Sequence, residues 1–174
     1  MPEDRSLFRK LLAGREARAW AQKFILGVDG VSCVVQISLN VPGLPKNIPG
    51  DMEAVATARR FFLRELGAKP SFRAVLRDGA GIAEIFPFAM DASDVKKTAI
   101  ETEDGHEWGR ALDIDVINET GALSRESFGE RPRTCLLCEK PAKICAREAN
   151  HGRGDLRAEV IRLLDLARSE SRYP

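Results

Sequence analysis

The stretch "GRALDIDV" (Gly109–Val116) decides the fold that this sequence predicts. Its apolar and acidic residues alternate, which is typical of a strand with one buried face, because successive side chains of a strand point to opposite sides. We therefore expect a strand at residues 111–117 whose alternate apolar residues face the core. Asp113 and Asp115 then share the other face, with Cα atoms about 6.5–7 Å apart.

Outward from this strand, hydrophobic periodicity predicts helices at both ends of the chain and further strands between them. We expect helices from a cap at Asp4 or Ser6 to about residue 20, at residues 52–66, at residues 155–169 and in part of the cysteine segment. We expect strands at residues 31–41, 98–103 and 122–128, and two more within residues 71–90. The expected fold is α+β, in a single domain over residues 1–174. Its mainly antiparallel or mixed sheet is packed by the N- and C-terminal helices.

The composition excludes some classes of partner. The chain has 174 residues, 27 Lys and Arg against 26 Asp and Glu, and a formal net charge of +1. A dedicated nucleic-acid binder normally carries an excess of basic residues. The opening "MPEDRSLFRK" lacks the apolar stretch of a signal peptide, and no apolar run approaches the ~18 residues of a membrane span. We expect a cytoplasmic protein with no nucleic-acid partner and no membrane partner.

The paired aspartates indicate a metal site. Two carboxylates on one face repel each other unless a cation, a proton or a neighbouring arginine compensates. Mg²⁺ is the cation that such oxygen ligands hold at sites that handle phosphates. Glu101 and Glu103 repeat the spacing on the strand expected at residues 98–103, so four acids could converge on one surface. The alternative is that Asp113 and Asp115 form the solvent-facing side of an edge strand.

The cysteines suggest a second metal. Cys135, Cys138, Cys145 and His151 read C-x2-C-x6-C-x5-H, and these are the residue types of a tetrahedral Cys₃His zinc site. Without a secretory signal, reduced thiols or metal ligands are favoured over a disulfide framework. The alternative is that the cysteines fall near one helical face and act as small buried hydrophobic residues. Spacing alone leaves Zn²⁺ and burial both open.

Longer motifs add a family resemblance. "GRALDIDV", followed by "LSRESF" (123–128) and "RPRTCLLCEKPAKICAREANHG" (131–152), resembles the signature of the apo-citrate lyase phosphoribosyl-dephospho-CoA transferase family. "LLAGREAR" (11–18), "NVPGLPK" (40–46) and "DVKKTAIETEDGHEWGR" (94–110) lie upstream in the family's order and at compatible spacing. The resemblance thus spans nearly the whole chain.

The resemblance implies a phosphodiester-forming transfer of the nucleotidyltransferase type. A serine hydroxyl of the apo acyl-carrier subunit of citrate lyase attacks the α-phosphate of 2'-(5''-triphosphoribosyl)-3'-dephospho-CoA, and pyrophosphate leaves. Such a transfer needs positioning and charge neutralisation. Asp113 and Asp115 would therefore hold Mg²⁺ beside the triphosphate.

Five further residues are candidates for binding the nucleotide. Arg110 would contact the triphosphate, although it could instead neutralise the two aspartates. Gly109 would admit a phosphate close to the backbone, or serve only as a turn glycine. Lys46 and Lys96 match family positions and would be point charges for phosphate, against the alternative of solvated lysines. Arg125, beside Ser124, would line the same face.

The general base is sought among Glu101, Glu103 and His106, which could also ligate metal. Two other functions stay open. One is a zinc-stabilised interaction module whose functional surface is "CLLCEK" (135–140). The other is a metal-dependent phosphohydrolase that uses the same two aspartates.

Overall fold

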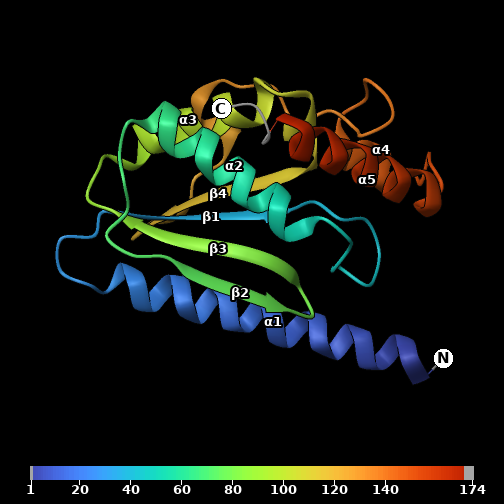
Figure 1. The fold of residues 1–174 in the computed structure, drawn as a ribbon, viewed down its shortest axis with the longest axis horizontal. Coiled ribbons are helices and arrows are strands. Elements are labelled where there is room, and N and C mark those ends of the chain that lie inside the picture. Colours follow the sequence, from blue (N-terminus) through green and yellow to red (C-terminus); the bar gives the residue numbers. More distant parts are fainter. Residues whose placement is uncertain (1, 171–174) are drawn as a thin grey trace.

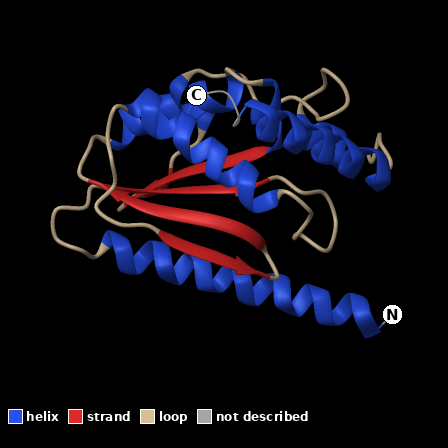
Figure 2. Ribbon diagram, viewed as in Figure 1, coloured by secondary structure: helices blue, strands red, loops and turns tan. Residues whose placement is uncertain are grey.

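A five-stranded sheet forms the centre of the protein (Figures 1 and 2). The computed structural model describes residues 2–170, with side chains from Arg5 onward. The sheet has the order β2-β3-β1-β4-β5, and every neighbouring pair is antiparallel. The strands are β1 (Cys33–Leu39), β2 (Ala74–Asp78), β3 (Gly81–Phe88), β4 (Leu112–Asn118) and β5 (Gly121–Ala122). The α+β prediction is confirmed, and the sheet is antiparallel.

The helices divide between the two faces of the sheet (Figure 2). The helices are α1 (Pro2–Leu26), α2 (Asp51–Leu66), α3 (Ala92–Asp104), α4 (Ala142–Arg147) and α5 (Arg153–Glu170), with 3₁₀ turns η1 (Glu107–Ala111) and η2 (Arg125–Phe128). One face is covered by α1, and α2, α3 and α5 lie on the other side (Figure 1). Among residues 2–170, no helix combines the length and the apolar composition needed to cross a membrane.

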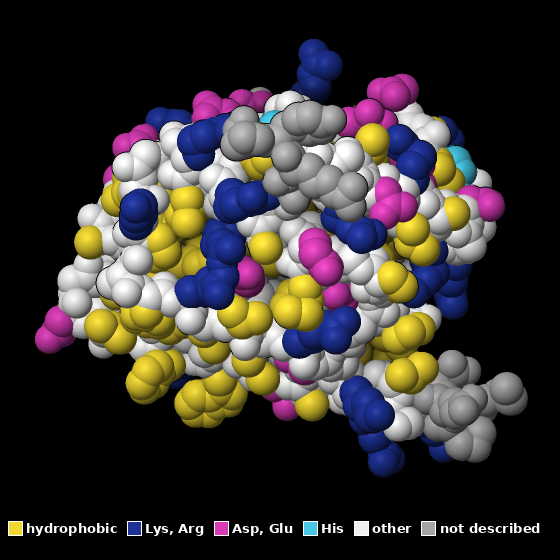
Figure 3. Space-filling model, viewed as in Figure 1, with side chains coloured by type: hydrophobic (Ala, Val, Ile, Leu, Met, Phe, Trp, Pro, Cys, Tyr) yellow, Lys and Arg dark blue, Asp and Glu magenta, His cyan; other side chains and the backbone are white. Residues whose placement is uncertain are grey.

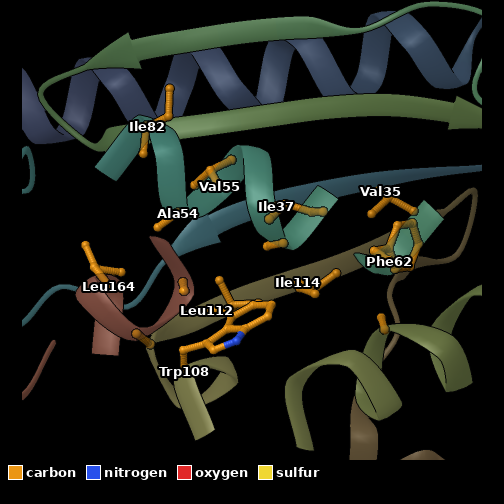
Figure 4. Packing of buried hydrophobic residues seen from close by; sticks show 14 of the residues in the cluster. Val35, Ile37, Ala54, Val55, Phe62, Ile82, Trp108, Leu112, Ile114 and Leu164 are labelled. Atoms are coloured by element: carbon orange, nitrogen blue, oxygen red, sulfur yellow. The ribbon is translucent and has the colours of Figure 1, made fainter. Parts of the chain in front are cut away.

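The main core lies between the sheet and α2 and α5. Figure 4 shows Leu112 and Ile114 of β4 pointing toward the same apolar space as Phe62 of α2 and Leu164 of α5. All four side chains are at most 2% exposed. Full burial of one such side chain contributes about 1.5–3 kcal/mol to the free energy of unfolding. The apolar half of the β4 alternation therefore anchors this strand in the core, as predicted.

The opposite face carries α1 over β1, β2 and β3. A small cluster of Ile25, Val34 and Ile85 joins the helix to the sheet. The outer side of α1 carries exposed apolar side chains among its charged ones: Trp20 is 74% and Phe24 is 78% exposed. Figure 3 shows hydrophobic side chains gathered over this helix, at the bottom of the view.

The strand predicted at residues 98–103 is wrong, because these residues belong to α3. The helix begins after Asp91, whose side chain accepts a hydrogen bond from the amide of Ser93 at 2.8 Å. Val95 and Ala99, four residues apart, are fully buried in the core. An N-cap and helical burial spacing outweigh the local strand preference of Thr98 and its neighbours.

Two other boundaries also differ from prediction. The predicted strand at residues 122–128 shortens to Gly121–Ala122, because the Ser124 side chain accepts a hydrogen bond from the Ser127 amide at 3.3 Å and caps η2. The first helix already includes Pro2, so Asp4 and Ser6 lie inside it and neither is its cap.

Candidate active site

Asp113 and Asp115 lie on the α1 side of the sheet, as the alternation predicts. In the register of β1 and β4, Asp113 is opposite Ser38 and Asp115 is opposite Gln36. The Gln36 side-chain amide donates a hydrogen bond to Asp115 Oδ2 at 3.4 Å. Both aspartates are half-buried. Burial, followed by repulsion from Asp113, raises the pKa of Asp115 to about 6.

The two acids face cations across a cleft between α1 and β4. Polar side chains line this α1–β4 cleft: Arg15, Arg18, Gln22, Gln36, Ser38, Asn40, Lys46, Asp113 and Asp115. Three of these side chains are basic and stand opposite two carboxylates. The cleft therefore combines the charges that a phosphate group and a divalent cation need together.

Arg18 is the most unusual member of the α1–β4 cleft. It is only 8% exposed, and its Nη2 lies 3.7 Å from Asp78 Oδ1. Among the described residues, its Nε and Nη2 atoms are buried and have no hydrogen-bond partner. Burial lowers the pKa of Arg18 against the attraction of Asp78, Asp113 and Asp115. The Arg18 guanidinium therefore forms an ion pair with Asp78 and keeps two buried nitrogens that can donate hydrogen bonds to an anion.

Lys46 belongs to the same cleft. Its Nζ donates to the Val41 carbonyl at 2.5 Å, which folds the side chain back over its own loop. Burial lowers the pKa of Lys46, and Arg15 and Arg157 lower it further. The structure thus places Lys46 in the same cleft as the acid pair and the other basic side chains.

Lys96 and Glu103 lie elsewhere, along the outer edge of β4. Lys96 is only 5% exposed, so it is not a solvated lysine, and its Nζ donates to the Ile114 carbonyl at 3.2 Å. The Ile114 amide donates to Glu103 Oε1 at 2.8 Å. Burial raises the pKa of Glu103, opposed most strongly by Arg133. The two side chains satisfy backbone groups that a neighbouring strand would otherwise pair.

The expected convergence of four acids is therefore wrong. Glu101 and Glu103 are in a helix, where residues two apart point to different sides. Glu101 is exposed, whereas Glu103 is 4% exposed beneath β4. Neither lines the α1–β4 cleft.

A second cleft lies next to the first, and Asn40 lines both. Its basic residues are Arg110, Arg125, Arg131 and Arg133. Arg125 is paired with Glu103 at 3.0 Å and with Asp104 at 3.1 Å, so it does not share the face of the aspartates. We refer to this site as the arginine cleft.

Arg110 does not neutralise the aspartates. Its guanidinium donates to the Cys135 carbonyl, and its buried Nε has no partner among the described residues. Arg133 has the neutralising position instead: it lies 3.3 Å from Asp113 Oδ1, pairs with Glu103 and donates to the Leu112 carbonyl at 2.6 Å. Arg133 thus connects the arginine cleft to the acid pair.

His106 and Gly109 have packing roles in the structure. The His106 ring stacks on Trp108 with centroids 4.5 Å apart, and its nitrogens lie 3.7 Å from Glu65 and 3.5 Å from Glu170. It lines the arginine cleft and not the α1–β4 cleft. At Gly109, a Cβ atom would collide with the Glu103 carbonyl, so the close approach is to protein backbone.

The four predicted zinc ligands come together. The ligand atoms of Cys135, Cys138, Cys145 and His151 all lie within 4.8 Å of one another. The alternative that the cysteines fall near one helical face is wrong, because only Cys145 lies in α4. This Cys/His cluster is therefore a candidate metal-binding group.

No functional role was predicted from the sequence for Arg15, Arg18 or Arg133. Arg15 and Arg18 occur in "LLAGREAR", which carried the resemblance but received no role. Arg15 and Arg18 reach the aspartates only because α1 lies beside β4, about a hundred residues later in the chain. A local sequence pattern cannot predict such a long-range contact.

Comparison with known proteins places the chain in a family. A family model described as apo-citrate lyase phosphoribosyl-dephospho-CoA transferase matches residues 7–166. Curated relatives with that name in Escherichia coli O139:H28 (strain E24377A / ETEC) and O8 (strain IAI1) are 37% identical over 128 residues. A relative in Shigella boydii serotype 18 (strain CDC 3083-94 / BS512) is equally similar, and each alignment covers 67% of this chain and 70% of the relative. The chain is thus a transferase, and it belongs to the apo-citrate lyase phosphoribosyl-dephospho-CoA transferase family.

Proposed function

We propose that this enzyme attaches a prosthetic group to the apo acyl-carrier subunit of citrate lyase. The donor is 2'-(5''-triphosphoribosyl)-3'-dephospho-CoA, the acceptor is a serine hydroxyl, and pyrophosphate is released. The observation that carries the proposal is the α1–β4 cleft, where Asp113 and Asp115 face Arg15, Arg18 and Lys46. The names of the relatives supply the reaction class.

The basic side of the cleft suits the triphosphate. Arg18 has two buried nitrogens free to donate, and a guanidinium can hold two phosphate oxygens at once. Arg15 and Lys46 add charge on either side. These three residues would fix the leaving pyrophosphate, so that the α-phosphate stands in line for attack.

The acidic side suits Mg²⁺. Both donors are half-buried carboxylates on one strand face. Burial, followed by repulsion from Asp113, raises the pKa of Asp115, and a bound cation would favour the ionised form of both acids. Asp113 and Asp115 would hold the ion. When bound, Mg²⁺ supplies neutralisation of phosphate charge. Arg133, 3.3 Å from Asp113, holds that carboxylate in place from the other side.

The proton of the serine hydroxyl has no assigned acceptor in this proposal. Glu103 is occupied by the Ile114 amide and by Arg125 and Arg133. Glu101 and His106 lie outside the α1–β4 cleft. We therefore give none of these three the role of base.

The arginine cleft would receive the rest of the nucleotide. Arg110 has a buried Nε without a partner among the described residues and lies next to Arg131 and Arg133. Because Asn40 lines both clefts, one extended ligand can reach from one to the other. We assign the diphosphate of the dephospho-CoA portion to this site.

The proposal is tested by mass spectrometry of the acyl-carrier subunit. Incubation with enzyme, Mg²⁺ and the triphosphoribosyl precursor should add the mass of the phosphoribosyl-dephospho-CoA group to one serine, with release of one pyrophosphate. Omission of Mg²⁺ should prevent the mass shift. Hydrolysis of the precursor with an unmodified carrier would instead identify a phosphohydrolase. Binding of the carrier with no chemistry would identify an interaction module.

A further inference from the structure

We propose that Cys135, Cys138, Cys145 and His151 bind one structural Zn²⁺ ion, which orders residues 133–151 and thereby fixes Arg133 beside Asp113. The zinc site itself is independent of the proposed reaction. Only the consequence for Arg133 rests on the proposed function.

The geometry of the cluster fits zinc. Cys138 Sγ and Cys145 Sγ are 3.8 Å apart, and His151 Nε2 is 3.3 Å from Cys138 Sγ. Zn–S bonds of about 2.3 Å and Zn–N bonds of about 2.0–2.1 Å place neighbouring ligands of a tetrahedron about 3.5–3.8 Å apart. A disulfide would need a sulfur–sulfur distance near 2.05 Å. All three cysteines are free thiols.

The type and number of ligands select the metal and its role. Thiolates and imidazole are soft ligands that favour zinc over the Mg²⁺ expected at the aspartates. Four protein ligands complete a tetrahedron, which is typical of a structural site, whereas catalytic zinc keeps one open position. The cluster therefore differs from the pair of aspartates in chemistry, and none of its four residues lines the α1–β4 cleft.

The surrounding chain has little else to stabilise it. Residues 133–142 form one tight loop, in which the Cys135 amide donates to Lys140 O and the Ala142 amide donates to Arg133 O, both at 2.8 Å. α4 has only six residues. Leu136 reaches the main core, but Leu137 is 39% and Ile144 is 46% exposed, so much of the apolar surface of the segment stays exposed. A metal would supply the free energy that a small core does not.

The loop ties the cluster to the active site. Arg133 lies two residues before Cys135 and contacts Asp113, Glu103 and the Leu112 carbonyl. Arg110 donates to the carbonyl of Cys135 itself. Zinc at Cys135 would therefore hold two arginines of the arginine cleft in position.

The first test is metal content. The purified chain should contain one zinc per molecule by inductively coupled plasma mass spectrometry. Replacement by Co²⁺ should give the visible d–d bands and thiolate charge-transfer bands of a tetrahedral thiolate site. Cys138→Ser and Cys145→Ser should lose both signals. Cys33→Ala is the matched control, because Cys33 is a buried thiol of β1 outside the cluster, and it should keep both.

Exchange of one ligand for another distinguishes loss of the zinc site from a general failure to fold. His151→Cys should retain zinc and shift the Co²⁺ spectrum to that of four thiolates. A wild-type protein that has no stoichiometric zinc and gives no tetrahedral Co²⁺ spectrum overturns the site. So does retention of zinc by a folded Cys138→Ser, Cys145→Ser double variant.

The second test concerns order and position. Removal of zinc by a chelator should speed tryptic cleavage at Lys143 and Arg147 by at least about tenfold, since local opening exposes the segment. The zinc-depleted wild type, assayed with Mg²⁺ restored after the chelator has been removed, should also transfer the prosthetic group more slowly, but zinc depletion should add little to the loss in Arg133→Gln. Unchanged cleavage overturns the ordering role. If zinc removal slows transfer by Arg133→Gln by the same factor as transfer by the wild type, the link to Arg133 is overturned. If the wild type binds zinc but never transfers the group, the proposed function is wrong and the zinc site still stands.

Discussion

The amide of Ile114 donates a hydrogen bond to the Glu103 carboxylate at 2.8 Å, so a side chain of α3 pairs with the outer edge of β4. Lys96 completes the arrangement by donating to the Ile114 carbonyl. Ile114 lies between Asp113 and Asp115, and this pairing fixes the strand that presents both acids to the α1–β4 cleft. The buried side chains of Lys96 and Glu103 therefore help to fix the position of β4, the strand that carries both aspartates.

Glu103→Ala should destabilise the protein strongly. The change leaves the Ile114 amide unpaired and removes the buried partner of Arg125 and Arg133. Breaking a buried pair on one side costs about 3–5 kcal/mol. Urea denaturation measures this loss in the free energy of unfolding. Glu103→Gln, which can still accept from the amide, should lose less, and equal stability of Glu103→Ala and wild type would refute the bracing role.

Arg18→Ala should weaken binding of the precursor more than it weakens the fold. Its removal costs the ion pair with Asp78, but its buried Nε and Nη2 have no hydrogen-bond partner to lose among the described residues. A charged hydrogen bond to phosphate contributes about 1.5–3 kcal/mol, which is about 10–100-fold in affinity. Isothermal titration with the precursor measures this. Arg9→Ala, an exposed arginine of the same helix, is the control and should bind like wild type.

Asp115→Asn should stabilise the metal-free protein near neutral pH. The pKa of Asp115 is raised from 3.8 to about 6, so the folded state keeps a proton that the unfolded state loses. Stability from this group is complete below pH 3.8 and falls as pH rises to about 6. Above that pH, the variant should be more stable by about 1–2 kcal/mol, allowing for partial solvent screening.

Urea denaturation from pH 4 to pH 8 tests this dependence on Asp115. The difference between variant and wild type should vanish at the acid end. Added Mg²⁺ should stabilise wild type at pH 8 but not Asp115→Asn, because the cation removes the repulsion from Asp113. A stability difference that is constant across this pH range would contradict the assignment.

Gly109→Ala should destabilise the protein, because the new Cβ would collide with the Glu103 carbonyl. Backbone cannot yield as a flexible side chain does, so we expect a loss of about 1–3 kcal/mol. Gly154→Ala in α5 is the matched control, since no atom lies within 4 Å of its added Cβ. Thermal unfolding should show Gly154→Ala at or above the wild-type midpoint and Gly109→Ala below it.

The local sequence pattern was sufficient to predict the structure where a single hydrophobic periodicity was clear. The alternation of β4 predicted the shared face of Asp113 and Asp115, since a strand has only two faces. It failed at residues 98–103, where strand-forming Thr98 and Ile100 lie in a helix. There the Asp91 cap and the burial of Val95 decide the structure, and burial depends on packing that the sequence does not display.

The two acids of the site and Lys46 were predicted from the sequence, whereas the arginines that lie near them were not. Asp113 and Asp115 are neighbours in sequence, so their geometry follows from strand spacing alone. Arg18 meets them only because α1 packs across the sheet, and Arg133 reaches Asp113 only through the loop of the Cys/His cluster. Arg110 and Arg125, which are closer in sequence to the acids, point into the arginine cleft instead.

If Asp113 and Asp115 act on the transferred phosphate, the rate of carrier labelling depends on both carboxylates. With Mg²⁺ and the triphosphoribosyl precursor, we expect Asp113→Asn and Asp115→Asn to label the acyl-carrier serine at least about 10³-fold more slowly than wild type. Asp165→Asn, an exposed aspartate of α5, should label at the wild-type rate. If both cleft variants fold and label the carrier as fast as wild type, the reaction takes place elsewhere.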